Sequence, residues 1–135
     1  MRIGVLVVTM IALLAAAAGY ADNTNTAVKN AAALAREIEN GSIKKANESV
    51  RVESRDCQLS IEFTNHNVTF QVPLGSSRVI ETDNGDSVVL INSAMTRKIR
   101  DRAAEPYERL YLRFDRKTIV QMKTQFEQVI RACET

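Results

Sequence analysis

The chain has 135 residues, with 18 basic and 16 acidic side chains, so its formal net charge is +2 at neutral pH. Because basic and acidic side chains are nearly balanced, the net charge does not indicate any class of partner. The length fits a single domain that can bury a hydrophobic core.

Residues 1–21 have the pattern of a secretory signal peptide. A short basic start, Met1 and Arg2, is followed by an apolar run and by small residues that suit cleavage after Ala21. A retained membrane anchor is the alternative, but the run is short for a span, which needs about 20 residues. We expect export to a bacterial periplasm, or secretion, with no transmembrane segment after cleavage. Without Arg2 the formal charge is +1.

The first predicted element of the mature chain is a helix over residues 27–40. Its apolar positions recur at helical spacing and form a thin stripe rich in alanine. They are Val28, Ala31, Leu34, Ala35 and Ile38. Gly41 is expected to end the helix in the left-handed conformation. Such a stripe favours a peripheral helix that covers one edge of the domain, with a partner-docking helix as the alternative.

Residues 57–74 predict a β-hairpin. Apolar and polar residues alternate on both sides of Asn65 and His66. If these two residues form the turn, Phe63 faces Val68 and every apolar side chain falls on one face. A slip of one residue would move them all to the other face, so the register is specified. Both turn residues tolerate positive φ, as a primed hairpin turn requires.

Further short strands are expected on both sides of this hairpin. Val50 and Val52 indicate a strand before it, and alternation predicts others over residues 78–82, 87–92, 94–102 and 107–114. The strands over residues 78–82 and 87–92 are joined through Asn84-Gly85, the strongest short hairpin signal. That acidic turn lacks the longer ligand pattern of a calcium loop.

The last element is an amphipathic helix that Asp115 is expected to cap. Its apolar residues recur at helical spacing and form one continuous stripe. They are Ile119, Met122, Phe126, Val129, Ile130 and Cys133. This stripe is the strongest helix signal in the chain.

Cys57 and Cys133 are the only cysteines. In an oxidising compartment, two cysteines of a small exported domain are expected to form a disulfide. With two cysteines the connectivity is unambiguous. The bond would tie the last helix to the start of the central hairpin.

The order of elements predicts an α+β fold. Residues 22–49 supply the N-terminal helix and a connector, and residues 50–134 supply an antiparallel sheet and the C-terminal helix, all in one domain. Antiparallel strands followed by an amphipathic helix resemble the pleckstrin-homology-like architecture, in which such a helix plugs a curved sheet. The tryptophan typical of that helix has no counterpart, because the chain contains no Trp. An open β-meander with a helix across it is the alternative.

The sequence shows no catalytic set. A Ser-His-acid triad would have to use His66, which lies in a predicted turn, and paired cysteines cannot act as nucleophiles. No phosphate-binding loop and no metal-ligand spacing is present, so we predict no cofactor, no metal and no enzyme activity.

One region is distinctly basic. Residues 97–117 hold eight basic and four acidic side chains. If the two predicted strands of this region pair, alternation places five cations and two tyrosines on one face without an acid. The predicted binding residues are Lys98, Arg100, Arg102, Arg109, Tyr111 and Arg113. Such a face could attract an anionic envelope lipid, glycan or protein, whereas export disfavours nucleic acid. The alternative is a solvated face whose charges prevent edge pairing.

Two functions are therefore expected. The first is an exported, non-catalytic binding module of the cell envelope that uses the basic face. The second is an inhibitor or accessory subunit of an envelope enzyme, which would present an exposed loop at residues 65–66 or 103–106.

Overall fold

The computed structural model describes residues 26–42 and 49–134. The signal peptide predicted over residues 1–21 lies outside the described residues, and so does the segment 43–48 of the predicted connector. Among the described residues no helix is both long and apolar enough to cross a membrane.

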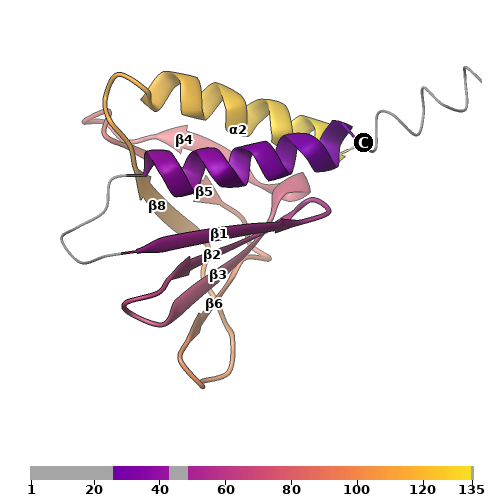
Figure 1. Cartoon of the computed structure of the whole chain (residues 1–135), viewed down its shortest axis with the longest axis vertical. Coiled ribbons are helices and arrows are strands. Elements are labelled where there is room, and N and C mark those ends of the chain that lie inside the picture. The colour runs from indigo at the N-terminus through magenta and orange to yellow at the C-terminus, as the bar shows by residue number, and fades with distance from the viewer. Residues whose placement is uncertain (1–25, 43–48, 135) are drawn as a thin grey trace, which may run out of the picture.

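The described residues form two α-helices and eight strands (Figure 1). The N-terminal helix comprises residues 26–41, α2 is Ile119–Glu134, and a single 3-10 turn, η1, is Leu74–Ser76. The strands are β1 (Val50–Arg55), β2 (Gln58–Phe63), β3 (Val68–Pro73), β4 (Arg78–Glu81), β5 (Ser87–Ile91), β6 (Thr96–Ile99), β7 (Glu105–Pro106) and β8 (Arg109–Arg113).

The strands form one antiparallel meander that bends into two sheets. The larger sheet has the order β1-β2-β3-β6-β7 and the smaller β4-β5-β8. The pairs β4–β5 and β3–β6 are two halves of one long hairpin, and β5–β8 and β6–β7 are two halves of the next. The predicted α+β fold with an antiparallel sheet is thus confirmed, and three bent stretches carry the chain between the sheets.

A buried amide holds two of these bends together. Asn92, between β5 and β6, is 3% exposed. Its Nδ2 donates to the carbonyl oxygen of Pro73 at 2.8 Å and to the Oγ atoms of Ser77 and Ser76 at 2.9 and 3.2 Å, at the bend between β3 and β4. Its Oδ1 accepts from the backbone N–H of Ala94 at 2.7 Å. One side chain therefore satisfies polar groups that the bends leave without ladder partners.

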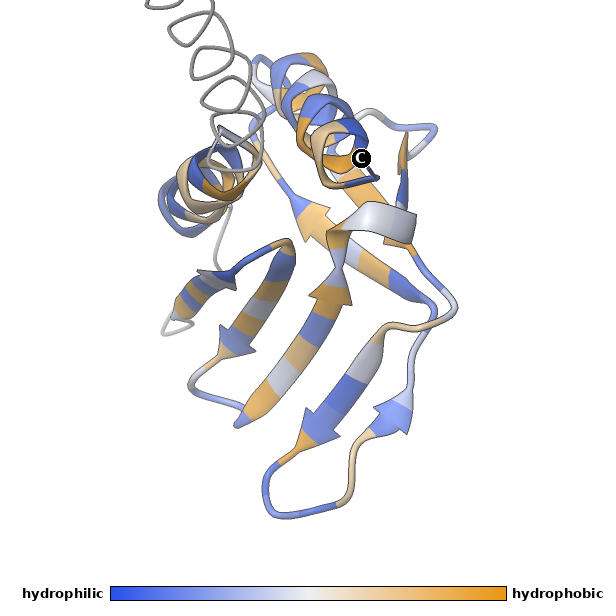
Figure 2. Ribbon diagram, turned by 90° about the vertical axis from the view of Figure 1, so that its right-hand side faces the viewer, coloured by the Kyte–Doolittle hydropathy of each residue, from blue (hydrophilic) through white to orange (hydrophobic). Residues whose placement is uncertain are grey.

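The predicted register of the central hairpin is confirmed, but its turn differs. Phe63 pairs with Val68, and the pairing continues along β2 and β3 as alternation required. The turn is a four-residue loop, and the positive φ, 51°, falls on Asn67. Asn67 then accepts a backbone hydrogen bond from Arg100 at 2.8 Å. Figure 2 shows hydrophobic and hydrophilic bands alternating along the strands of the larger sheet.

The N-terminal helix contributes to the core, with two corrections to the prediction. Val28 is 37% exposed, and Ala27 takes the buried position instead. Gly41 does not adopt positive φ, because residue 41 still belongs to the helix and the backbone N–H of Ser42 bonds to Ile38 at 3.0 Å. The buried residues of this helix join those of both sheets and α2 in one hydrophobic cluster.

Helix α2 packs on η1, β4 and β5 through the predicted stripe. Phe126 is fully buried, and Cys133 forms the predicted disulfide with Cys57 at a Cα–Cα distance of 5.7 Å. Such a bond is consistent with an oxidising, exported location. Asp115 does not cap the helix itself: its carboxylate accepts from the backbone N–H of Lys117 in the preceding turn, and the helix begins four residues after it.

Candidate functional site: a basic and apolar face of the smaller sheet

The predicted basic residues divide between the two sheets. On this side β6 pairs with the two-residue β7, which precedes the predicted strand over residues 107–114, and Arg97 lies opposite Glu105. The chain then bends, and β8 pairs with β5 in the smaller sheet. The continuous face expected from the pairing of these strands is therefore not formed. The sequence could not show this, because alternation carries no information about a change of sheet.

Lys98, Arg100 and Arg102 belong to the β6–β7 hairpin. Lys98 lies on β6 opposite Thr69, whereas Arg100 and Arg102 lie in the turn that follows, not on the strand as predicted. A hollow of about 460 Å³ contains Lys98 and Arg100, and acidic Glu62 lines it too. Because Asp101 also lines this hollow, the group is not the acid-free surface that the sequence suggested.

Tyr107, the second tyrosine expected on the basic face, packs against the core instead and does not join Tyr111. Its ring lies 5.3 Å from that of Phe70, and the Arg97 guanidinium sits 4.3 Å from its centroid. Arg97 Nε also donates to Glu105 at 3.0 Å, and this hydrogen bond raises the pKa of Arg97 above its ordinary value. These contacts fix the base of the β6–β7 hairpin.

Arg109, Tyr111 and Arg113 do share a face, on the smaller sheet. All three are exposed, and they alternate with the buried Leu110 and Leu112 on β8. This outward pattern agrees with the prediction for this strand.

The structure adds residues of β4 and β5 to this face. Across the sheet, Arg78, Ile91 and Arg109 form one row, and Ile80, Val89 and Tyr111 form the next. We call the outward side of β4, β5 and β8 the outer face. Its members are Arg78, Ile80, Ser87, Val89, Ile91, Arg109, Tyr111 and Arg113.

The centre of the outer face is apolar. Val89 is only 2% exposed, yet it lies outside the main hydrophobic cluster, because its side chain points away from α2. Its cross-strand neighbours Ile80 and Tyr111 are 42% and 55% exposed. Two large, partly exposed side chains thus cover a small one, and they leave apolar surface open to solvent.

A shallow hollow of about 610 Å³ lies over this apolar centre. Arg109 and Tyr111 line it on the β8 side. The acids Glu81, Asp83 and Asp86 line it at the β4–β5 turn. The outer face is therefore basic along β8 and acidic at its far corner.

The arginines of the outer face are unpaired among the described residues. Within residues 26–42 and 49–134, Arg78, Arg109 and Arg113 form neither a salt bridge nor a side-chain hydrogen bond. In contrast, Arg97 is committed to Glu105. The outer-face guanidinium groups are free to bind an external anion.

A signal for the missed residues was present in β5. Four apolar residues in succession, Val88 to Ile91, indicate a strand covered on both faces, whereas a strand with one solvated face alternates. Val89 and Ile91 must then lie on the side away from the core. Ile80 falls on the same side, so the apolar centre could have been inferred from β4 and β5 together.

The residues considered for catalysis are not assembled into a site. His66 is exposed in the turn after β2, and Cys57 and Cys133 are bonded to each other. In the described part of the chain, no three His, Cys, Asp or Glu side chains are grouped to hold a metal ion.

Comparison with known protein families, with characterised proteins and with solved structures finds no match to this chain. The resemblance to the pleckstrin-homology-like architecture therefore stays a prediction from the order of elements, and the site must be interpreted from its own chemistry.

Proposed function

We propose that this protein is a non-catalytic binding domain of the cell envelope that holds an anionic partner on its outer face. The observation that carries the proposal is that Arg78, Arg109 and Arg113 lie around an exposed apolar centre and form no salt bridge with any other described residue. Solvated arginines alone would serve solubility. Arginine and tyrosine beside apolar surface are instead the residues enriched at binding hot spots.

The charge along the β8 side of the face supports an anionic partner. Arg109 and Arg113 lie on either side of Tyr111 along one strand, so their charges reinforce each other over a short distance. A partner that buries Tyr111 and Ile80 would bring its acidic groups next to these guanidinium groups. Apolar burial and charge attraction therefore act on one surface, whereas the sequence alone indicated only the charge.

The test compares two double variants with the same change of net charge. Arg109→Glu with Arg113→Glu alters the outer face, and Arg100→Glu with Arg102→Glu alters the exposed β6–β7 turn. Binding is measured to phosphatidylglycerol vesicles, polyglutamate and heparin at two salt concentrations. Surface changes of this kind usually alter stability by less than about 0.5 kcal/mol, so both variants should fold.

We expect at least one probe to bind, more weakly at high salt because ions screen the interaction. The outer-face variant should lose at least tenfold in affinity, and the turn variant should retain most of it. If no probe binds, or if the two variants lose affinity equally, the outer face is not the binding surface.

The second function, an inhibitor or accessory subunit, is supported by the β6–β7 hairpin. Its residues from Arg100 to Pro106 are all exposed, and the contacts of Arg97 with Glu105 and Tyr107 fix its base. In Figure 1 this hairpin extends away from the helices. If the hairpin docks into an enzyme, the turn variant should lose the interaction and the outer-face variant should keep it.

A further inference from the structure

The two sheets expose four edge strands, and their edges differ in how they are protected. The edges are β1 and β7 in the larger sheet, and β4 and β8 in the smaller. An edge strand presents unpaired backbone N–H and C=O groups that can pair with another chain, unless a side chain, a proline or a packed element prevents it.

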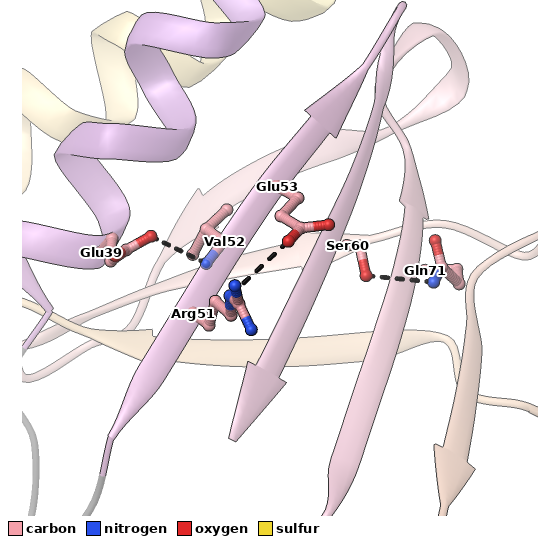
Figure 3. A network of polar contacts seen from close by, with 6 residues as sticks. All are labelled: Glu39, Arg51, Val52, Glu53, Ser60 and Gln71. Atoms are coloured by element: carbon pink, nitrogen blue, oxygen red, sulfur yellow. Dashed lines mark hydrogen bonds and ion pairs between the residues drawn. The ribbon is translucent and has the colours of Figure 1, made fainter. Parts of the chain in front are cut away.

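Three of these edges carry such protection along the strand. Among the described residues, β8 is covered only at its C-terminal end, where the next residue, Phe114, forms an isolated antiparallel bridge with Ser42. On β1 the outward N–H of Val52 donates to Glu39 Oε2 of the N-terminal helix at 3.0 Å, as Figure 3 shows. On β7 the outward residue Pro106 has no N–H to offer. On β4 only Val79 and Glu81 face outward, and α2 packs beside the strand.

The backbone of β8 faces outward at its basic residues. Hydrogen bonds from Asn92 to Glu108 and from Phe114 to Asp86 mark the two ends of the β5–β8 ladder. Hydrogen-bonded pairs alternate in an antiparallel ladder, so Leu110 and Leu112 bond to β5. The peptide groups of the intervening residues, Arg109, Tyr111 and Arg113, therefore point away from the sheet.

Within the described ranges, the N–H groups of Arg109 and Tyr111 have no hydrogen-bond partner. Buried, unbonded N–H groups are costly and rare, and both residues are exposed, so these groups face solvent. We propose that β8 accepts an extended acidic peptide, which would add a strand to the smaller sheet and place its acids beside Arg109 and Arg113.

Side-chain spacing fits such a peptide. Alternate residues of a strand lie about 6.8 Å apart on one face, so an added strand would set every second side chain beside Arg109, Tyr111 and Arg113. Acids opposite the two arginines and an apolar residue opposite Tyr111 would give three favourable cross-strand pairs. The acidic corner at Asp86 lies in the β4–β5 turn, on the far side of β8 from the added peptide.

Charge also excludes a second copy of this chain as the occupant. Two β8 strands paired antiparallel about Tyr111 would set Arg109 of each against Arg113 of the other. Like charges directly opposite destabilise a strand pair. The arginines thus prevent self-association, while an acidic strand would remove the repulsion.

This inference rests on the proposed anionic partner, and the experiment separates the two. The probe is a synthetic seven-residue peptide with glutamate at positions 1 and 5, valine at position 3 and threonine elsewhere. Positions 1, 3 and 5 then share one face, and the peptide stops short of Ser42, which pairs with Phe114. Its control has the same sequence with methyl groups on the backbone nitrogens that would face β8, so charge and side chains are unchanged. Phosphatidylglycerol vesicles provide an anionic surface without a peptide backbone. Binding to the oxidised protein is measured by fluorescence anisotropy, together with amide hydrogen exchange.

We expect the acidic peptide to bind and to slow exchange at Arg109 and Tyr111. The methylated peptide should bind at least tenfold more weakly, and Arg109→Glu with Arg113→Glu should abolish binding of both. Equal affinity for the two peptides would overturn strand addition and leave intact the proposal that the outer face binds an anionic partner. Strand addition is also overturned if only the vesicles bind. If the Arg109→Glu, Arg113→Glu variant then loses vesicle binding, the outer face still holds an anionic partner. If neither the peptides nor the vesicles bind, the inference is rejected, and the proposed function loses its support from these probes.

Discussion

The buried amide of Asn92 offers the sharpest test of how the two sheets are joined. Asn92→Asp keeps the shape of the side chain and the oxygen that accepts from Ala94. It removes the Nδ2 donor that serves Pro73 and Ser77 and sets a carboxylate oxygen against the carbonyl of Pro73. The substitution therefore changes hydrogen-bond chemistry at the bends with little change in volume.

The magnitude follows from the polar groups that lose a partner. Ser77 Oγ still donates to the Pro73 carbonyl at 2.6 Å, so neither of these groups is left wholly unpaired. The main cost is the new carboxylate oxygen, which has no donor to accept from, and such a buried group costs about 1–3 kcal/mol, more when it is charged. We therefore expect Asn92→Asp to lower the free energy of unfolding by about 2–4 kcal/mol, a large part of the 5–15 kcal/mol typical of a domain.

The assay is urea unfolding of the oxidised protein, followed by circular dichroism. Asn84→Asp is the matched control, because Asn84 lies in the exposed β4–β5 turn, where its Oδ1 only accepts, from Thr82 at 2.7 Å. That control should change stability by less than about 0.5 kcal/mol. A loss below about 1 kcal/mol for Asn92→Asp would refute the reasoning and mean that the bends do not depend on this amide.

The pH dependence of the same variant gives an independent check. Burial raises the pKa of the introduced carboxyl above its unfolded value of about 3.9, and its protonated form can donate to Pro73. The folded variant then binds its proton more tightly than the unfolded chain does. The deficit relative to wild type should be smallest near pH 4 and grow as the pH rises toward 7.

Three further predictions concern the packing of α2. Phe126→Ala should lower the free energy of unfolding by about 3–5 kcal/mol in urea, because the fully buried ring leaves a cavity. Replacing Cys57 and Cys133 together by serine opens a link across 76 residues of sequence, and the chain-entropy model gives an upper loss of about 4.5 kcal/mol, measurable by the same method. Gly75→Ala should destabilise by about 1–3 kcal/mol, since an added Cβ would lie 3.0 Å from the carbonyl oxygen of Cys133.

Each of these has a clear contrary result. A change below about 1 kcal/mol for Phe126→Ala would mean that α2 does not pack on the sheets. Alkylation of two thiols in the oxidised wild-type protein would show that the disulfide is not formed. A stabilised Gly75→Ala variant would show that the backbone near Cys133 shifts to accept the added Cβ. The remaining effect of the alanine would then be to lower the conformational entropy of the unfolded chain.

Local signals predicted the elements whose neighbours in space are also neighbours in sequence. The pairing of Phe63 with Val68 follows from alternation around one turn, and the stripe through Phe126 follows from helical spacing. The disulfide could be paired because the chain has only two cysteines. In each case a single principle determines the outcome, so little depends on tertiary context.

The candidate site could be predicted only in part. The outward direction of Arg109, Tyr111 and Arg113 follows from alternation along β8. Their separation from Lys98 does not, because the bends depend on contacts such as those of Asn92, which no local pattern encodes. Gly41 shows the same limit at a helix end, where the helix continues through residue 41 and Ser42 pairs with Phe114 in place of the expected left-handed stop.

The bent stretches also constrain how the molecule can come apart. Each long hairpin contributes strands to both sheets. Loss of pairing in one sheet therefore lengthens a loop that the other sheet must close, which weakens the pairing that remains. A boundary between independently unfolding units would have to cut through β3–β4, β5–β6 and β7–β8 at once. We therefore expect the two sheets to melt as one cooperative unit, with hydrogen-exchange protection that rises and falls together across them.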